Sequence, residues 1–111
     1  MKEYTKSIRK ELRTLNGLAH ERYLDRALGE LQQQFARWES KEIDGFELKE
    51  AIHQFHNGES RELYNYFIGN QDLNGSKVAK AIAEGVISRT ELSKETLDAI
   101  ANIIERLESD F

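Results

Sequence analysis

The sequence predicts an all-α protein, a single compact domain of four to six helices that begins with a long N-terminal helical segment. Three observations support this class. The 111 residues include no proline and only seven glycines, so few positions would interrupt a helix. Apolar residues recur three and four positions apart, as on one face of a helix. β-branched and aromatic residues do not alternate with polar ones over a strand's length, so no strand is expected.

The N-terminal segment is predicted to be helical from an N-cap at Thr5 to about Ser40. It carries two apolar stripes in succession: Ile8, Leu12, Leu15 and Ala19, then Leu24, Leu28, Leu31, Phe35 and Trp38. At about 100° per residue the stripes point in different directions, so one straight helix cannot aim both at a single core. Either the helix breaks at Asn16-Gly17, or its first third packs against a different body, such as another subunit.

Shorter helices are expected in the rest of the chain. They cover about 44–57, 59–69 and 76–84, and a last one begins after an N-cap at Ser93. The first of them is expected to end at Asn57-Gly58. The second is expected to be central, because its apolar residues spread over most of its circumference: Leu63, Tyr64, Tyr66 and Phe67.

Charge is unevenly distributed along the chain. The formal net charge of −4 combines +3 over residues 1–41 with −7 over residues 42–111. An acidic majority disfavours general nucleic-acid binding, which depends on Lys and Arg that neutralise phosphates. Only the N-terminal arm could supply such charge, on the edge opposite the first stripe: Lys2, Lys6, Arg9, Lys10 and Arg13.

The composition also bears on the compartment. The chain has no cysteine, which excludes disulfides, thiolate metal sites and a cysteine nucleophile. The first residues lack the apolar core of a secretory signal, and no apolar run approaches the roughly 18 residues of a membrane-spanning helix. We therefore expect a soluble cytoplasmic protein.

Three residues that can ligate metals are spaced three positions apart in the predicted helix over 44–57. Glu50, His53 and His56 all project away from that helix's apolar stripe. Glu-x-x-His is the element that carboxylate-bridged di-metal bundles use, but such bundles need it twice, and the sequence holds one copy. The alternative is a solvated surface, with His56 favourably placed near the negative end of the helix dipole. We expect no cofactor, and keep a metal-binding protein or enzyme as the alternative.

Two further motifs are weaker. The stretch from Asn70 to Ala81 spaces its oxygen donors as a calcium loop does, but Ala81 stands where the bidentate glutamate belongs, so a turn before a helix is the better interpretation. Ala81 and Gly85 are spaced as in a helix-turn-helix, which makes a DNA-binding regulator the second alternative. The would-be recognition segment offers Arg89 and Lys94 against two glutamates, which is poor for DNA.

The function that the sequence favours is a small protein-interaction or regulatory module without catalytic activity. Its hypothesised partner is a protein, possibly a second copy of itself in a homodimer. The misaligned first stripe is the reason, since large aliphatic side chains are unfavourable in water. The predicted partner-binding residues are Ile8, Leu12 and Leu15, with Arg9 and Arg13 beside them.

Overall fold

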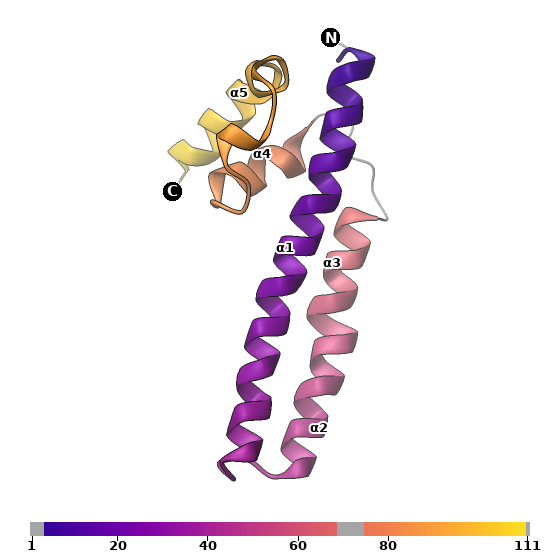
Figure 1. The fold of residues 1–111 in the computed structure, drawn as a ribbon, viewed down its shortest axis with the longest axis vertical. Coiled ribbons are helices and arrows are strands. Elements are labelled where there is room, and N and C mark those ends of the chain that lie inside the picture. The colour runs from indigo at the N-terminus through magenta and orange to yellow at the C-terminus, as the bar shows by residue number, and fades with distance from the viewer. Residues whose placement is uncertain (1–3, 69–74, 111) are drawn as a thin grey trace. The chain divides into compact units, whose positions relative to one another are not determined.

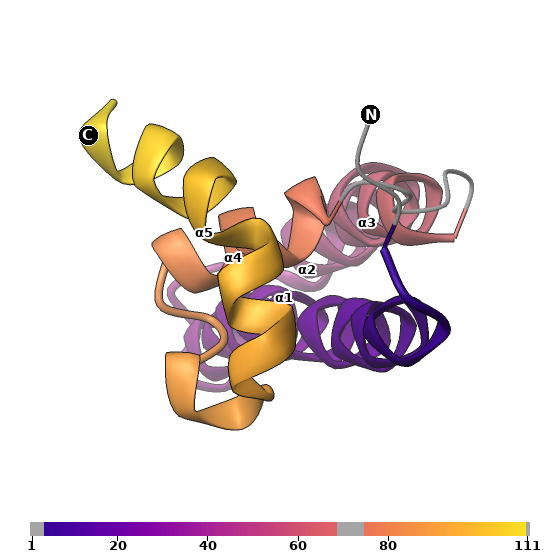
Figure 2. The same ribbon diagram turned by 90° about the horizontal axis from the view of Figure 1, so that it is seen from above.

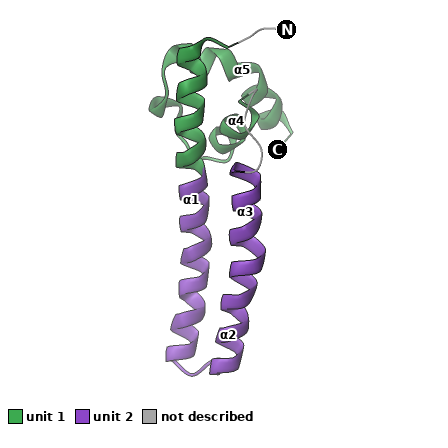
Figure 3. Cartoon of the chain, turned by 90° about the vertical axis from the view of Figure 1, so that its right-hand side faces the viewer, with its two compact units in different colours: residues 1–19, 71–111 green, residues 20–70 purple. Residues whose placement is uncertain are grey.

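The computed structural model describes residues 4–68 and 75–110. Every regular element in these two ranges is helical, which confirms the all-α class and the long N-terminal helix (Figure 1). Contacts between residues divide the chain into two compact units (Figure 3). Unit 1 comprises residues 1–19 and 71–111, and unit 2 comprises residues 20–70. The first helix, α1 (Lys6–Glu39), contributes its beginning to unit 1 and its remainder to unit 2.

Of the two alternatives left open for the N-terminal segment, the break at Asn16-Gly17 is wrong. The Thr5 hydroxyl caps the helix as expected, accepting a hydrogen bond from the Ile8 backbone N–H at 3.1 Å. The helix then continues through Asn16 and Gly17 without interruption. The misaligned stripes need no bend because they belong to different units, so they do not have to reach a common core.

Unit 1 has a well-filled hydrophobic core. After α1 it contains α4 (Ser76–Ala83), the short 3-10 helix η2 (Arg89–Glu91) and α5 (Lys94–Ser109), and α4 and α5 pack against each other (Figure 2). Its most completely buried large side chains come from all three α-helices and the loop after α4: Leu12, Val78, Ile87, Thr96 and Ile100. The prediction of a helix ending before Gly85 and of a Ser93 N-cap is confirmed, since Ser93 accepts from the Thr96 backbone N–H.

Gly75 lies where α1 and α5 meet in unit 1. Its φ of +77° is in the left-handed region, which favours glycine. A Cβ atom added to Gly75 would lie 2.6 Å from Cγ2 of Ile100 and 3.6 Å from the methyl groups of Leu12. The first stripe of α1 thus packs close to α5, and this packing requires a residue without a side chain at position 75.

A hydrogen-bond network ties α1 to the start of α5. The Glu11 carboxylate accepts from the Ser93 backbone N–H at 3.0 Å and from the Ser93 hydroxyl at 2.8 Å. The Thr96 hydroxyl and these two Ser93 groups lower the pKa of Glu11 because they stabilise the charged form, and partial desolvation opposes them. A carboxylate at a helix N-terminus is also favoured by the helix dipole. The network therefore stabilises the docking of α1 in unit 1.

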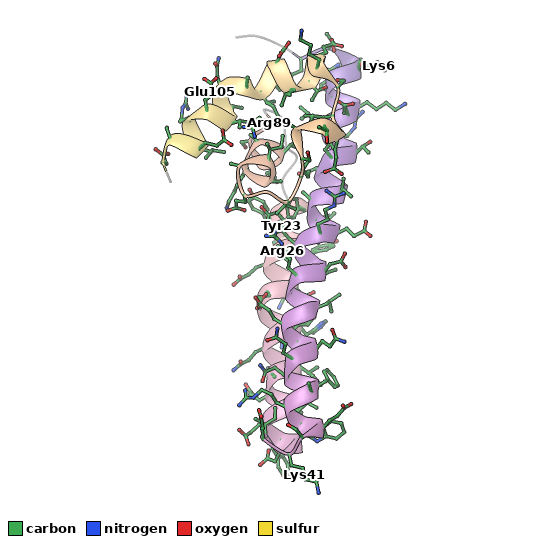
Figure 4. All side chains as sticks on the ribbon, turned by 60° about the vertical axis from the view of Figure 1, so that its left-hand side comes forward. Lys6, Tyr23, Arg26, Lys41, Arg89 and Glu105 are labelled. Carbon is green, nitrogen blue, oxygen red and sulfur yellow. The ribbon has the colours of Figure 1, made fainter. Side chains whose placement is uncertain are left out.

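Unit 2 is a helical hairpin. Residues 20–39 of α1 lie antiparallel to a second arm made of α2 (Gly45–Gln54), the π-helical turn η1 (Phe55–Glu59) and α3 (Ser60–Phe67) (Figures 1 and 3). The connecting turn contains Lys41 in a left-handed conformation (Figure 4). Asp44 and Glu47 then form a capping box at the start of α2, which fixes where the second arm begins.

The predicted helix end at Asn57-Gly58 is wrong, because the chain continues through a π turn. The Ser60 N–H donates to the Phe55 carbonyl, five residues back. A π turn contains one residue more than an α-helical turn, and the residues of the arm that face α1 explain why it occurs here. Leu48, Ala51 and Phe55 face α1 before the turn, and Ser60, Leu63 and Phe67 face it after the turn. The five-residue step from Phe55 to Ser60 keeps both sets facing α1, whereas a regular α-turn would bring Glu59 inward instead.

The hairpin buries little apolar surface. The Phe67 ring stacks on His20, with ring centroids 5.1 Å apart, and contacts Tyr23 at 5.8 Å. Arg26 lies over the Tyr23 ring on α1 (Figure 4). The buried apolar residues of unit 2 are Ala27, Ile43, Leu48 and Phe67. The expectation that α3 is central is therefore wrong: Phe67 is buried, but Tyr64 and Tyr66 are exposed, because a two-helix hairpin covers one face of each helix.

Candidate functional site

The predicted partner-binding residues lie at the start of α1, in unit 1. Ile8, Leu12 and Leu15 are buried within this chain, so they are core residues in this structure and not an exposed surface. Arg9 and Arg13 are exposed. The sequence left two possible covers for this stripe, a bend in the helix or a second chain. The structure shows the stripe buried in the unit that holds α4 and α5, with Leu12 close to Gly75 and Ile100.

The candidate metal ligands do not converge. Glu50 accepts a hydrogen bond from Gln54 at 3.3 Å, and the His53 ring lies 3.1 Å from the Asn57 amide nitrogen. Each three-residue step turns about 60° round a helix, so Glu50 and His56 point in directions about 120° apart. Within residues 4–68 and 75–110, no three His, Cys, Asp or Glu side chains are placed to hold one metal ion. The geometry gives the metal alternative no support.

The calcium-like stretch lies partly outside the residues that the structure describes, and the helix-turn-helix-like stretch lies within them. Residues 70–74 of the calcium-like stretch lie outside the described residues, as do Lys2 of the basic edge and the predicted helix end at Gly69. In the helix-turn-helix-like stretch, one terminal nitrogen of Arg89 lies 2.8 Å from both carboxylate oxygens of Glu108. This ion pair engages the guanidinium that the DNA hypothesis would need for a phosphate or base contact.

Unit 2 carries the unusual surface of the molecule. Of the residues that the structure describes, all the large apolar side chains left exposed belong to this unit: Leu28, Phe35, Trp38, Phe46, Ile52, Tyr64, Tyr66 and Ile68. Single exposed apolar residues are ordinary, but a set gathered on one small element marks an interaction surface.

Several of these side chains share one side of the hairpin. Each directly follows a residue that faces the other arm. One step along a helix turns about 100° round its axis, so each of these side chains points about 100° away from the inward direction, which is the direction of the other arm. Because the arms are antiparallel, this rotation leads to the same side of the hairpin in both. We call the resulting surface the apolar side: Leu28, Phe35, Ile52, Tyr64 and Ile68, which follow Ala27, Gln34, Ala51, Leu63 and Phe67.

The opposite side of the hairpin is polar. A shallow groove runs between the arms there, with Ala27, Leu31 and Phe55 at its floor and polar residues at its rims: Glu30, Gln34, Gln54 and Glu59. Glu30, Gln54 and Glu59 directly precede residues that face the other arm, so they are turned from the inward direction in the opposite sense to the apolar side. The hairpin thus has one side suited to water and one suited to apolar contact.

The exposed fractions on the apolar side are substantial. Leu28 is 43% exposed, Phe35 39%, Ile52 39% and Tyr64 56%. Sequence reasoning grouped Leu28 and Phe35 in the second stripe but could not tell that the chain leaves them uncovered. The spacing of that stripe shows that its residues need cover, but no local signal in the sequence shows whether the chain supplies it.

The comparisons with other proteins leave the surface to be interpreted from this chain alone. Among the described helices, none has both the length and the apolar character needed to span a membrane. No protein-family model matches the sequence, and no curated protein or solved structure matches the chain.

Proposed function

We propose that this protein is a small cytoplasmic interaction module that binds a protein through the apolar side of its unit 2 hairpin. One observation supports this most strongly: the exposed large apolar side chains belong to unit 2, and five of them share that side. The proposal keeps a non-catalytic, protein-binding role for the N-terminal helical segment. It moves the binding residues from the first stripe of α1 to the second.

The energetic case is that the hairpin is incomplete by itself. Fully burying an exposed Leu, Ile or Phe side chain is worth about 1.5 to 3 kcal/mol. Leu28, Phe35 and Ile52 are 43%, 39% and 39% exposed, so covering what remains exposed of the three would supply about 2 to 4 kcal/mol. Helices become stable chiefly by packing an apolar face, and two helices bury only one face of each. A protein partner on the apolar side would supply the missing cover.

The shape of the site favours a protein over a small molecule. Ligand pockets are concave and enclose most of a small ligand, whereas the apolar side is formed by two neighbouring helices. The apolar side includes the aromatic residues Phe35 and Tyr64 and has charged residues at its edges, which is typical of protein interfaces. A helical partner is the natural complement, because helix ridges pack into helix grooves.

A photo-crosslinking experiment in the cells that make the protein tests this function. The photo-reactive residue benzoylphenylalanine replaces Phe35 in the full chain, and adducts are identified by mass spectrometry. The matched control places it at Gln33, which is also exposed on α1 but lies on the polar side. We expect protein adducts at position 35 and few at position 33. Equal yields at both positions, or none at 35, would refute the proposal.

A further inference from the structure

We infer that the protein bound on the apolar side is a second copy of this chain, related by a two-fold axis parallel to the hairpin. The two hairpins would form a four-helix bundle in which α1 of each copy packs against α2 and α3 of the other. This inference rests on the proposed function and specifies its partner. Three independent observations carry it: the direction of the second stripe, the distribution of charge and the size of the surface.

The second stripe of α1 has the spacing of a bundle seam. Leu24, Leu28, Leu31, Phe35 and Trp38 are separated by four, three, four and three residues, the heptad pattern of helices that pack side by side. The stripe's centre is turned about 60° away from the second arm, toward the apolar side. In a square four-helix bundle each helix directs its core stripe about 45° from either neighbour, toward the bundle axis. The stripe therefore points toward the axis of a four-helix bundle, and the hairpin of one copy supplies only two of the four helices.

Charge on the apolar side is segregated between the two arms. On α1 the charged residues of this side are acidic: Glu21, Asp25 and Glu39. On the second arm this side carries no Asp or Glu among the described residues, and its basic residues are Lys49, His56 and Arg61. His56 and Arg61 line one shallow depression together with Tyr64, which places them on the same side as Tyr64. The surface is therefore complementary to itself when α1 meets the second arm.

This segregation selects one of the two possible two-fold arrangements. An axis parallel to the hairpin brings the acidic edge of α1 against the basic edge of the partner's second arm. An axis across the hairpin would bring α1 against α1, placing acid opposite acid. Like charges across an interface suppress association, so complementarity favours the first arrangement, in which the hairpin turns of both copies lie at the same end.

The register of the hairpin places opposite charges at matching heights. Phe67 packs on His20 and Tyr23, and the arms are antiparallel, so Arg61 lies level with Asp25 to within about one helical turn. A two-fold axis parallel to the hairpin leaves these heights unchanged. Arg61 of one copy therefore comes opposite Asp25 of the other, and the pair occurs twice in the dimer.

The size of the surface suits a dimer of modest affinity. Twenty helical residues span about 30 Å, and two helices side by side are about 20 Å wide, so each copy offers about 600 Å². Two copies would bury about 1,200 Å², the lower limit of stable protein interfaces. We therefore expect the dimer to have a dissociation constant in the low micromolar range, and the sedimentation experiment has to cover that range.

Sedimentation of the full chain from about 1 to 200 µM tests the association. We expect the mass to rise from one chain to two, with the dimer weakened at least about 100-fold by Phe35→Asp because each dimer buries that side chain twice. Gln33→Asp, two residues away on the polar side, is expected to leave the dimer unchanged. Circular dichroism verifies that both variants remain helical. A wild-type monomer throughout, or equal effects of the two substitutions, would overturn the inference.

Two measurements test the arrangement within the dimer. Arg61→Glu is expected to weaken the dimer about tenfold, and adding Asp25→Arg is expected to restore it. Because the chain has no cysteine, Ser40→Cys accepts one spin label per copy beside the hairpin turn. A distance below about 25 Å between the two spin labels supports the arrangement in which both hairpin turns lie at the same end of the dimer. A distance of about 35 Å or more refutes that arrangement. Failure of the charge exchange to restore binding also counts against this arrangement.

The outcomes separate this inference from the proposed function. If the chain is monomeric at every concentration but benzoylphenylalanine at position 35 captures a different protein, the second copy is wrong and the interaction surface stands. If position 35 captures nothing in cells and the chain is monomeric, both are wrong. Capture of the chain by itself, together with the loss of dimer in Phe35→Asp, supports both.

Discussion

At the scale of single residues, Gly75 and Gly85 make a matched pair. Both have positive φ, +77° and +78°, so any other residue is strained at either position. They differ in their surroundings: a Cβ at Gly75 would lie 2.6 Å from Ile100, whereas a Cβ at Gly85 would meet no heavy atom within 4 Å. The backbone requirement is thus shared, and the steric requirement belongs to Gly75 alone.

The comparison of Gly75→Ala with Gly85→Ala isolates that steric requirement. We expect Gly85→Ala to cost about 1 kcal/mol through backbone strain, and Gly75→Ala to cost about 3 kcal/mol because overpacking adds to the strain. Urea unfolding of both variants at equal protein concentration measures the difference. Equal losses would mean that α1 and α5 do not pack closely around Gly75.

Glu11 is expected to make folding stability depend on pH. Its pKa is lowered in the folded protein by the Thr96 and Ser93 hydrogen bonds, so the folded state binds this proton more weakly than the unfolded chain. The stabilisation is therefore present above the ordinary glutamate pKa of about 4.3 and is lost as the pH falls through the lowered value. Glu11→Gln should cost about 1 kcal/mol at pH 7.

The pH profile provides the check on Glu11. The loss caused by Glu11→Gln should shrink as the pH falls below the ordinary range of a glutamate, because the wild type then loses the same charge. Glu105→Gln, an exposed substitution on α5 that changes the formal charge equally, is the control and should have little effect (Figure 4). A loss that stays constant down to acid pH would show that the carboxylate charge does not matter.

At the scale of the elements, the continuity of α1 is the feature with the widest consequences. Gly17 lies inside the helix, and a Cβ there would have no heavy atom within 4 Å. Glycine costs about 0.5 to 1 kcal/mol relative to alanine in a helix interior, so Gly17→Ala should stabilise the protein by that amount. Thermal unfolding measures it. A destabilised variant would indicate a turn at Asn16-Gly17 instead of a continuous helix.

Helix starts could be predicted from the sequence because their signals are local. Thr5 and Ser93 cap the helices that follow them, and each cap involves a backbone N–H three residues away. Helix ends were harder to predict. The Asn57-Gly58 pair resembles a stop, but the π turn is fixed by Leu63 and Phe67, which must face α1. That requirement comes from the other arm of the hairpin and cannot be seen in the turn itself.

At the scale of the whole chain, the apolar pattern shows which residues need cover but not what covers them. Ile8, Leu12 and Leu15 resembled a subunit interface, yet they are buried in the unit that also holds α4 and α5. Phe35 and Tyr64 resembled core residues, yet they are exposed. Which of these residues are buried depends on which later segments of the chain pack against each part of α1. Those contacts join residues distant in sequence, so the local pattern does not reveal them.

The central claim is that a second copy covers the exposed apolar side of unit 2, and side-chain footprinting tests it directly. Hydroxyl radicals react with exposed side chains of the full-length protein, and mass spectrometry gives the rate at each residue. Phe46 is 84% exposed and is not among the residues of the apolar side, so it is the internal reference for Phe35. At about 200 µM, well above the expected micromolar dissociation range, we predict that Leu28, Phe35 and Ile52 react far more slowly than their exposure in one copy implies, and that dilution restores their rates. Rates that match the exposure in one copy at every concentration would contradict the account.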